Sequence, residues 1–177
     1  MTVATITPAE ILTFWREVGP DRWFEADTEI DQKITKRFRP VHEAAVRGDL
    51  AAFEESAEGA LALVILLDQF SRNMFRGSAR AFAADPLARA VAARAIVRGF
   101  DRAVDETMRP FYYMPFMHSE VLADQHRSVE LFATCSGNWS DYAAQHRDVV
   151  QKFGRFPYRN LALGRDSTPA EHEFLKR

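Results

Sequence analysis

The sequence predicts an all-α protein, a single domain of about seven or eight helices over residues 1–177. Apolar residues recur three and four positions apart in successive windows, which is the spacing of one helix face. No window has the strict alternation of apolar and polar residues that is typical of a strand. The length of the chain favours one hydrophobic core over two.

The first two helices have clear start and stop signals. TPAE at residues 7–10 combines a capping hydroxyl, a proline at the first helical position and a glutamate that can return a hydrogen bond. The helix that it begins ends at Gly19. Asp27 caps the second helix, which Pro40 is expected to kink or break and which Gly48 ends. The apolar face of this second helix is Ile30, Ile34 and Phe38.

The central helix is predicted between Ser56 and Phe75. It is apolar on nearly every side from Leu61 to Leu67, so it should be buried all round. The next helix starts at Asp85-Pro86 and stops before Gly99, and its alanine-rich face favours close helix packing.

The last third of the chain is divided by prolines and glycines. Pro110 and Pro115 separate the aromatic segment FYYMPFMH from a helix that spans about residues 121–133. A second TPAE, at residues 168–171, is an independent capping box for the final helix. Before this final helix, another helix is capped by Asn138 or Ser140 and ends at Gly154. Its inner face is predicted to be Tyr142, His146, Val149, Val150 and Phe153.

Composition excludes several classes of function. The net charge of −2, with acids and bases mixed along the chain, argues against nucleic-acid binding. The most apolar run, Ala60–Leu67, is too short to cross a membrane. The first fifteen residues lack an export signal, and the single Cys135 fits a reducing compartment. We therefore expect a cytoplasmic protein.

The first polar constellation lies at the end of the central helix, in DQFSRN. Asp68 and Arg72 are four residues apart and can pair, while Gln69 and Asn73 form a neighbouring polar row. In one interpretation, Asp68, Gln69 and Arg72, with Gln125, form an internal structural network, because buried polar groups are usually satisfied within the protein. In the other, they form one wall of a polar pocket.

A second constellation combines His118 and Glu120, with Asp124 shortly after. A histidine with a carboxylate can carry general acid/base chemistry, or hold a metal if a third ligand folds nearby. Residues two apart diverge on a regular helix, so joint action requires His118 to precede the helix. No known metal-ligand spacing is present, so we expect no metal, and a capping or core histidine is the alternative.

The third constellation is His146 with FGRFPYRN at residues 153–160. Arg155 and Arg159 follow a helix stop and flank Pro157, so they could form a rigid clamp for a carboxylate or phosphate, beside Asn160. The alternative is that these arginines pair with Asp68, Glu120 or Asp124 and close the core. His146 itself could be an ordinary core residue. Glycine-rich phosphate loops, nucleophile elbows and CxxC pairs are absent from the sequence, so no cofactor is expected.

Three stretches, LLDQFSRNMFRG, FYYMPFMHSEVLADQHRSVELF and HRDVVQKFGRFPYRNLALGRDSTPAEHEFL, together with FWREVGPDRWFEAD, resemble the bacterial domain-of-unknown-function family 924. The resemblance covers nearly the whole chain. It implies antiparallel helix pairs in a tetratricopeptide-repeat-like array with a groove, and no established activity. Tyr158 stands where the family usually has histidine, and Ser71 where it has proline. A shared reaction that needs a histidine at position 158 is therefore disfavoured.

Two classes of function follow, with a structural alternative. The first is a binding module whose polar groove holds an anionic small molecule or a peptide carboxylate. The second is an enzyme that uses His118 or His146 with Glu120 for proton transfer and Arg159 to stabilise charge. In the third interpretation the polar cluster is purely structural. The candidate ligand-binding residues are Arg72, Asn73, His118, Glu120, His146, Arg155, Arg159 and Asn160.

Overall fold

The computed structural model describes residues 6–176, and within that range every regular element is a helix. The prediction of an all-α fold is confirmed. The α-helices are α1 (Pro8–Val18), α2 (Thr28–Arg47), α3 (Ala57–Val64), α4 (Ser71–Met74), α5 (Asp85–Val97), α6 (Pro110–Met117), α7 (Leu122–Phe132), α8 (Trp139–Phe153) and α9 (Pro169–Leu175). Short 3-10 segments are η1 (Ala51–Glu55), η3 (Ala79–Ala81), η4 (Phe100–Arg102) and η5 (Pro157–Arg159).

The central helix is continuous but not regular. A π-helical segment, η2 (Ile65–Phe70), joins α3 to α4, so the three run as one helix from Ala57 to Met74. Counted in this way, the described chain has eight helices. The π turn shifts the register of the side chains that follow it, and such turns occur frequently at functional sites. Asp68 lies within this turn.

The caps form as the sequence predicts. The side chains of Thr7 and Thr168 each accept a hydrogen bond from the backbone N–H of the glutamate three residues on, and the carboxylate of each glutamate accepts one from the backbone N–H of the threonine. Asp27 caps α2, and Gly48 ends it with a φ of 84° that only glycine adopts without cost. These signals depend on a few neighbouring residues, so they can be read from sequence.

Prolines have weaker effects than expected at two places. Pro40 lies inside α2, which continues to Arg47, so the helix is not broken there. Pro115 lies inside α6, which makes the proline-bounded aromatic segment a helix in its own right. Every residue of α6 is buried, so tertiary packing offsets the hydrogen bond that Pro115 removes.

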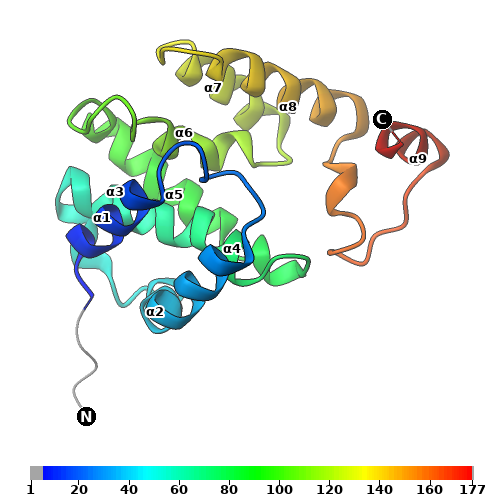
Figure 1. Cartoon of the computed structure of the whole chain (residues 1–177). Coiled ribbons are helices and arrows are strands. Elements are labelled where there is room, and N and C mark those ends of the chain that lie inside the picture. The colour runs from blue at the N-terminus through cyan, green and yellow to red at the C-terminus, as the bar shows by residue number, and fades with distance from the viewer. Residues whose placement is uncertain (1–5, 177) are drawn as a thin grey trace.

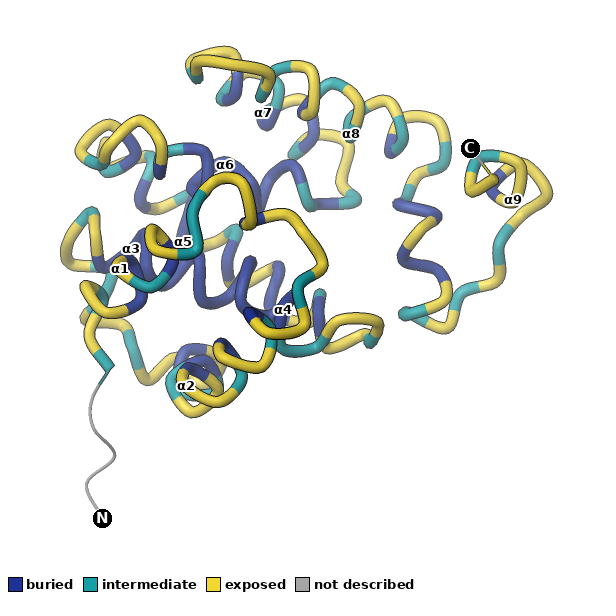
Figure 2. The backbone as a smooth tube through the Cα atoms, in the orientation of Figure 1, coloured by how far each residue is buried: buried dark blue, intermediate teal, exposed yellow. Residues whose placement is uncertain are grey.

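The core is built around α3, η2 and α6, whose residues are the most continuously buried of residues 6–176 (Figure 2). α1, α2 and α5 pack against α3 and η2, while α7 and α8 lie together beyond α6 (Figure 1). The chain after α8 passes through η5 to α9, whose surface is mostly exposed. Phe153 and Phe174, with ring centroids 5.1 Å apart, join α9 to the end of α8.

No helix among residues 6–176 is both long enough and apolar enough to span a membrane. The expectation that an export signal is absent rests partly on residues 1–5, which lie outside the described range.

Candidate functional site

The π turn places Asp68 at the centre of a buried polar cluster. Asp68 is 1% exposed, and its carboxylate accepts hydrogen bonds from His118 Nδ1 at 2.8 Å and from Gln69 Nε2 at 2.6 Å. Arg72 Nη1 lies 3.3 Å from the same carboxylate. Burial alone would raise the pKa of Asp68, but the charge of Arg72 and the bonds from His118 and Gln69 outweigh it and hold that pKa below 3.8. Asp68 is therefore ionised at neutral pH.

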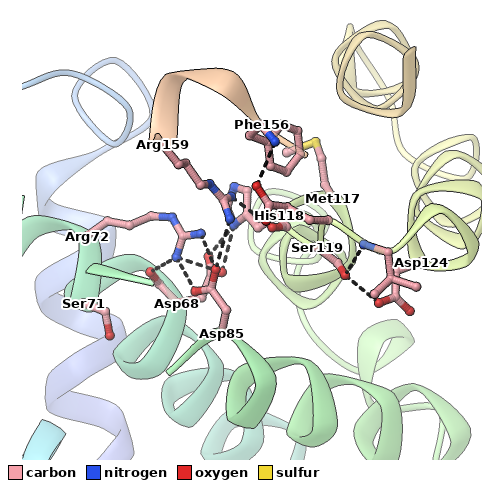
Figure 3. Close-up of polar contacts among 12 residues, drawn as sticks. Asp68, Ser71, Arg72, Asp85, Met117, His118, Ser119, Asp124, Phe156 and Arg159 are labelled. Atoms are coloured by element: carbon pink, nitrogen blue, oxygen red, sulfur yellow. Dashed lines mark hydrogen bonds and ion pairs between the residues drawn. The ribbon is translucent and has the colours of Figure 1, made fainter. Parts of the chain in front are cut away.

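A second carboxylate balances the arginines of this cluster. Asp85, 6% exposed, forms a two-bond pair with Arg72 at 2.8 and 3.0 Å, and lies 3.7 Å from Arg159 Nη1 (Figure 3). Arg159 is held between the rings of Phe82 and Phe156, with its guanidinium 4.5 Å from each ring centroid. Two cations thus face two anions, and the charges cancel inside the fold.

His118 connects the cluster to a cavity. It follows the last residue of α6, and Arg159 Nη2 donates to its backbone carbonyl at 2.9 Å. Because Nδ1 faces the ionised Asp68, this nitrogen carries the proton of the neutral ring. Burial is the main cause that lowers the pKa of His118 below 6.5, although Asp68 opposes the shift. The ring is 15% exposed.

The cavity has a volume of about 670 Å³ and a mostly apolar lining. It lies between the loop that joins α1 to α2, helix α6, and helix α8. His118 and His146 form one part of its wall, with ring centroids 6.4 Å apart. The apolar lining residues are Pro20, Trp23, Phe24, Met114, Met117, Trp139 and Tyr142, and the remaining ones are Glu106, Thr107, Cys135 and Ser136.

His146 has the same arrangement of its two ring nitrogens as His118. Its Nδ1 lies 2.8 Å from the backbone carbonyl of Tyr142, one turn earlier on α8, and a carbonyl can only accept. Burial, partly opposed by this hydrogen bond, lowers the pKa of His146 to about 4. The prediction that Tyr142 lies on the inner face of this helix is wrong. Its side chain is 52% exposed and lines the cavity instead of packing in the core.

FGRFPYRN serves two separate clusters. Arg159 joins the Asp68 cluster, whereas Arg155 pairs with Glu171 of α9 at 2.7 and 2.8 Å. The structure therefore does not bring the two arginines together as one clamp. Arg155 also lowers the pKa of Glu171 to about 2 by hydrogen bonding. Pro157 starts the 3-10 turn that separates the directions of the two side chains.

Glu120 and Asn160 bind this segment to Arg165 through hydrogen bonds. Glu120 accepts a bond from the backbone N–H of Phe156 at 2.8 Å and pairs with Arg165 through both oxygens, at 2.8 and 2.9 Å. Asn160 accepts from Arg165 and donates to Ser167. Glu120 is thus paired with an arginine. Within residues 6–176, it makes no hydrogen bond to His118 or His146.

The other two candidates lie outside the cluster. Asn73 donates to Asp31 of α2 at 2.8 Å, so it joins the central helix to its neighbour. Gln125 donates to the carbonyls of Met117 and Ser119 at 2.7 and 2.6 Å, which fixes the turn that carries His118. Of the predicted ligand-binding residues, His118 and His146 line the large cavity and the others do not.

Sequence reasoning missed Asp85 and most of the cavity wall. Asp85 looked like a helix start, which it is, and its second role as the partner of Arg72 had no local signal. Trp23, Phe24 and Trp139 line the cavity, and Trp23 belongs to the hydrophobic core as well. No local pattern marks these residues as a cavity wall, because they come from the α1–α2 loop and from α8, which are far apart in sequence.

Comparison with protein-family models identifies the family of this chain. Residues 11–177 match the family described as bacterial protein of unknown function (DUF924). A solved structure, that of a protein of unknown function from Agrobacterium tumefaciens, is 48% identical to this chain, with a TM-score of 0.93 over 96% of each chain. No curated protein is significantly similar. The chain belongs to the bacterial family of unknown function DUF924.

Proposed function

We propose that this protein binds a small molecule with a mainly apolar body in the cavity between the α1–α2 loop, α6 and α8. The observation that carries the proposal is the cavity itself, about 670 Å³ in volume, lined by aromatic and methionine side chains, with two imidazoles in its wall. Ligand pockets typically have volumes of roughly 300 to 1,000 Å³, apolar walls and a few polar groups that fix orientation.

An unused packing void is a poorer explanation of this cavity. Protein interiors are close-packed and leave few voids larger than a water molecule. Phe24 and Tyr142 line the cavity yet remain 57% and 52% exposed, so their rings are partly in contact with solvent. A bound apolar molecule would cover such surface and gain the corresponding burial energy.

The arginines give little support to an anionic small molecule or a peptide carboxylate as the ligand. The expectation of an anionic ligand rested on available arginines, but Arg72 and Arg155 are both paired with carboxylates of the protein. Arg159 faces Asp85 and the carbonyl of His118. Arg159 is therefore the only one of these three arginines without a close carboxylate pair, since Asp85 lies 3.7 Å away, and it is not part of the cavity lining.

Proton-transfer catalysis is the second candidate function. It is favoured by the Asp68–His118 pair, since a carboxylate that orients an imidazole at 2.8 Å is a common arrangement of a general base. Asp68 here takes the role that the sequence suggested for Glu120. If this candidate is right, Asp68→Asn retains ligand affinity within a few-fold but loses turnover of that ligand.

Two broader features belong to the same proposal. Helices α6, α7 and α8 pack in sequence order, which is consistent with the proposed tetratricopeptide-repeat-like array. The single, half-buried Cys135 is compatible with the proposed cytoplasmic location.

A thermal-shift screen with a cavity-blocking variant tests the proposal. Thr107 lines the cavity and is exposed, so Thr107→Trp should fill its mouth without disturbing the core. Thr13→Trp, at an exposed position of α1 away from the cavity, is the matched control. A compound at one hundred times its Kd stabilises the fold by about 2.7 kcal/mol, which raises the Tm by roughly 5 to 11 °C in a chain of this size.

We expect at least one apolar compound to shift wild type and Thr13→Trp equally, and Thr107→Trp much less. Equal shifts in all three proteins would place the binding site elsewhere and contradict the proposal. A broad library without any shift would contradict it as well.

A further inference from the structure

The hydrogen-bonding character of the cavity wall is set by its two imidazoles. Both rings donate from Nδ1, His118 to the carboxylate of Asp68 and His146 to the carbonyl of Tyr142. Within residues 6–176, neither Nε2 atom has a hydrogen-bonding partner, and both rings line the cavity. Since burial lowers the pKa of each ring, both are neutral near pH 7 and each Nε2 carries a lone pair. The two imidazoles therefore contribute two hydrogen-bond acceptors to the cavity wall. Neither has an N–H left to donate, because each Nδ1 proton is already bonded.

Charge in the lining works against an anion. Glu106 lines the cavity, and neither lysine nor arginine belongs to the described lining. Only neutral donors, such as Thr107, Trp139 and Tyr142, could pair a carboxylate or phosphate group in this lining, and burial of a charge that no cation pairs is costly. The cations closest to His118, Arg72 and Arg159, are directed at Asp68, Asp85 and the His118 carbonyl.

A metal ion fits the two imidazoles less well than an organic donor does. Zinc sites are usually four-coordinate, with three or four ligands from the protein. Among the described residues, no group of three or more histidine, cysteine, aspartate or glutamate side chains is placed to hold a metal ion. An organic ligand needs only one or two donor groups at this wall.

We infer that the ligand of this cavity is an organic molecule whose hydroxyl, phenol or N–H groups donate hydrogen bonds to Nε2 of His118 and His146. This inference rests on the proposed binding function and names the class of its ligand. Hydrogen bonds from such donors would satisfy both acceptors, while the apolar body contacts the aromatic and methionine side chains of the wall. His118, oriented by Asp68, and His146, oriented by the backbone, would then determine specificity.

Three probes of similar size, which differ in one group, test whether the cavity prefers a hydrogen-bond donor, an ether or an anion. Binding of 2-naphthol, 2-methoxynaphthalene and 2-naphthoate is measured by isothermal titration calorimetry at pH 7.5. We expect 2-naphthol to bind about fivefold or more tightly than its methyl ether, since one neutral hydrogen bond contributes about 1 kcal/mol. The naphthoate should bind more weakly than the naphthol.

Variants assign the effect to one imidazole, because 2-naphthol has a single hydroxyl and can donate to only one Nε2 at a time. His146→Phe keeps an aromatic ring in place but removes one acceptor. A fall of about fivefold in the preference for naphthol over its methyl ether would assign the hydrogen bond to His146, whereas an unchanged preference would assign it to His118. His126→Phe, at an exposed position of α7 outside the cavity, is the matched control and should leave the preference unchanged.

Each outcome has a distinct meaning. Equal affinity for naphthol and its methyl ether would overturn the inference while leaving cavity binding intact. Tightest binding of naphthoate would also overturn it, in favour of an anionic ligand. If none of the probes binds and the screen with Thr107→Trp is negative as well, the proposed function and the inference both fail.

Discussion

The substitution Asp85→Asn tests whether the buried charges of the Asp68 cluster are balanced as the structure indicates. Asn preserves the size of the side chain but removes the charge that faces Arg72 at 2.8 and 3.0 Å and Arg159 at 3.7 Å. Two arginines would then share the single carboxylate of Asp68. Removing one partner of a buried ion pair typically costs about 3 to 5 kcal/mol, because the remaining charge is left uncompensated. For a chain of this size, that cost lowers the Tm by roughly 6 to 20 °C.

The assay is urea unfolding followed by circular dichroism, with Asp148→Asn as the matched control. Asp148 pairs with its neighbour Arg147 at 2.6 Å, but its side chain is 63% exposed, so the same substitution there should cost less than about 1 kcal/mol. If Asp85→Asn costs no more than Asp148→Asn, the cluster does not depend on charge balance, and the reasoning is refuted.

Two further predictions concern the C-terminal helix and the response to acid. Arg155→Ala removes the partner of the buried Glu171, so α9 should detach and the 161–168 loop should become more sensitive to limited proteolysis; Lys176→Ala, which breaks an exposed pair, should not have this effect. Burial lowers the pKa of His146 from 6.5 to about 4, so the unfolded chain takes up the proton first on acidification. Stability should therefore fall as the pH drops from 6.5 toward 4, by at most about 1.4 kcal/mol per pH unit from this residue. His146→Phe should flatten the pH dependence of the unfolding free energy between pH 6.5 and 4, whereas an unchanged slope would contradict the lowered pKa of His146.

The helices could be predicted because their signals are local. Both TPAE boxes, the Asp27 cap and the glycine stops require only a few adjacent residues, and they form as expected. The apolar run of residues 61–67 identified the buried central helix for the same reason. The π turn at Ile65–Phe70 gave no such signal, since its register depends on how the whole core packs.

The site was only partly predictable because its partners are far apart in sequence. The pairing of Asp68 with Arg72 follows from their four-residue spacing, and the structure places them 3.3 Å apart. His118 lies fifty residues from Asp68, so their contact could not be read from spacing. The cavity itself exists only when a loop and two helices converge, which periodicity does not specify. The two arginines of FGRFPYRN illustrate the same limit: their positions were clear, but their separate partners were not.

Nitrogen-15 NMR of the histidine rings tests the central claim most directly. The claim is that His118 and His146 present unprotonated Nε2 atoms to a ligand cavity. At pH 7 we predict that both rings are neutral and protonated on Nδ1. We also predict that the Nε2 resonance of at least one of them moves when 2-naphthol is added, while those of His126 and His172 do not. Rings protonated on Nε2, or Nε2 resonances that ignore every cavity ligand, would contradict the account.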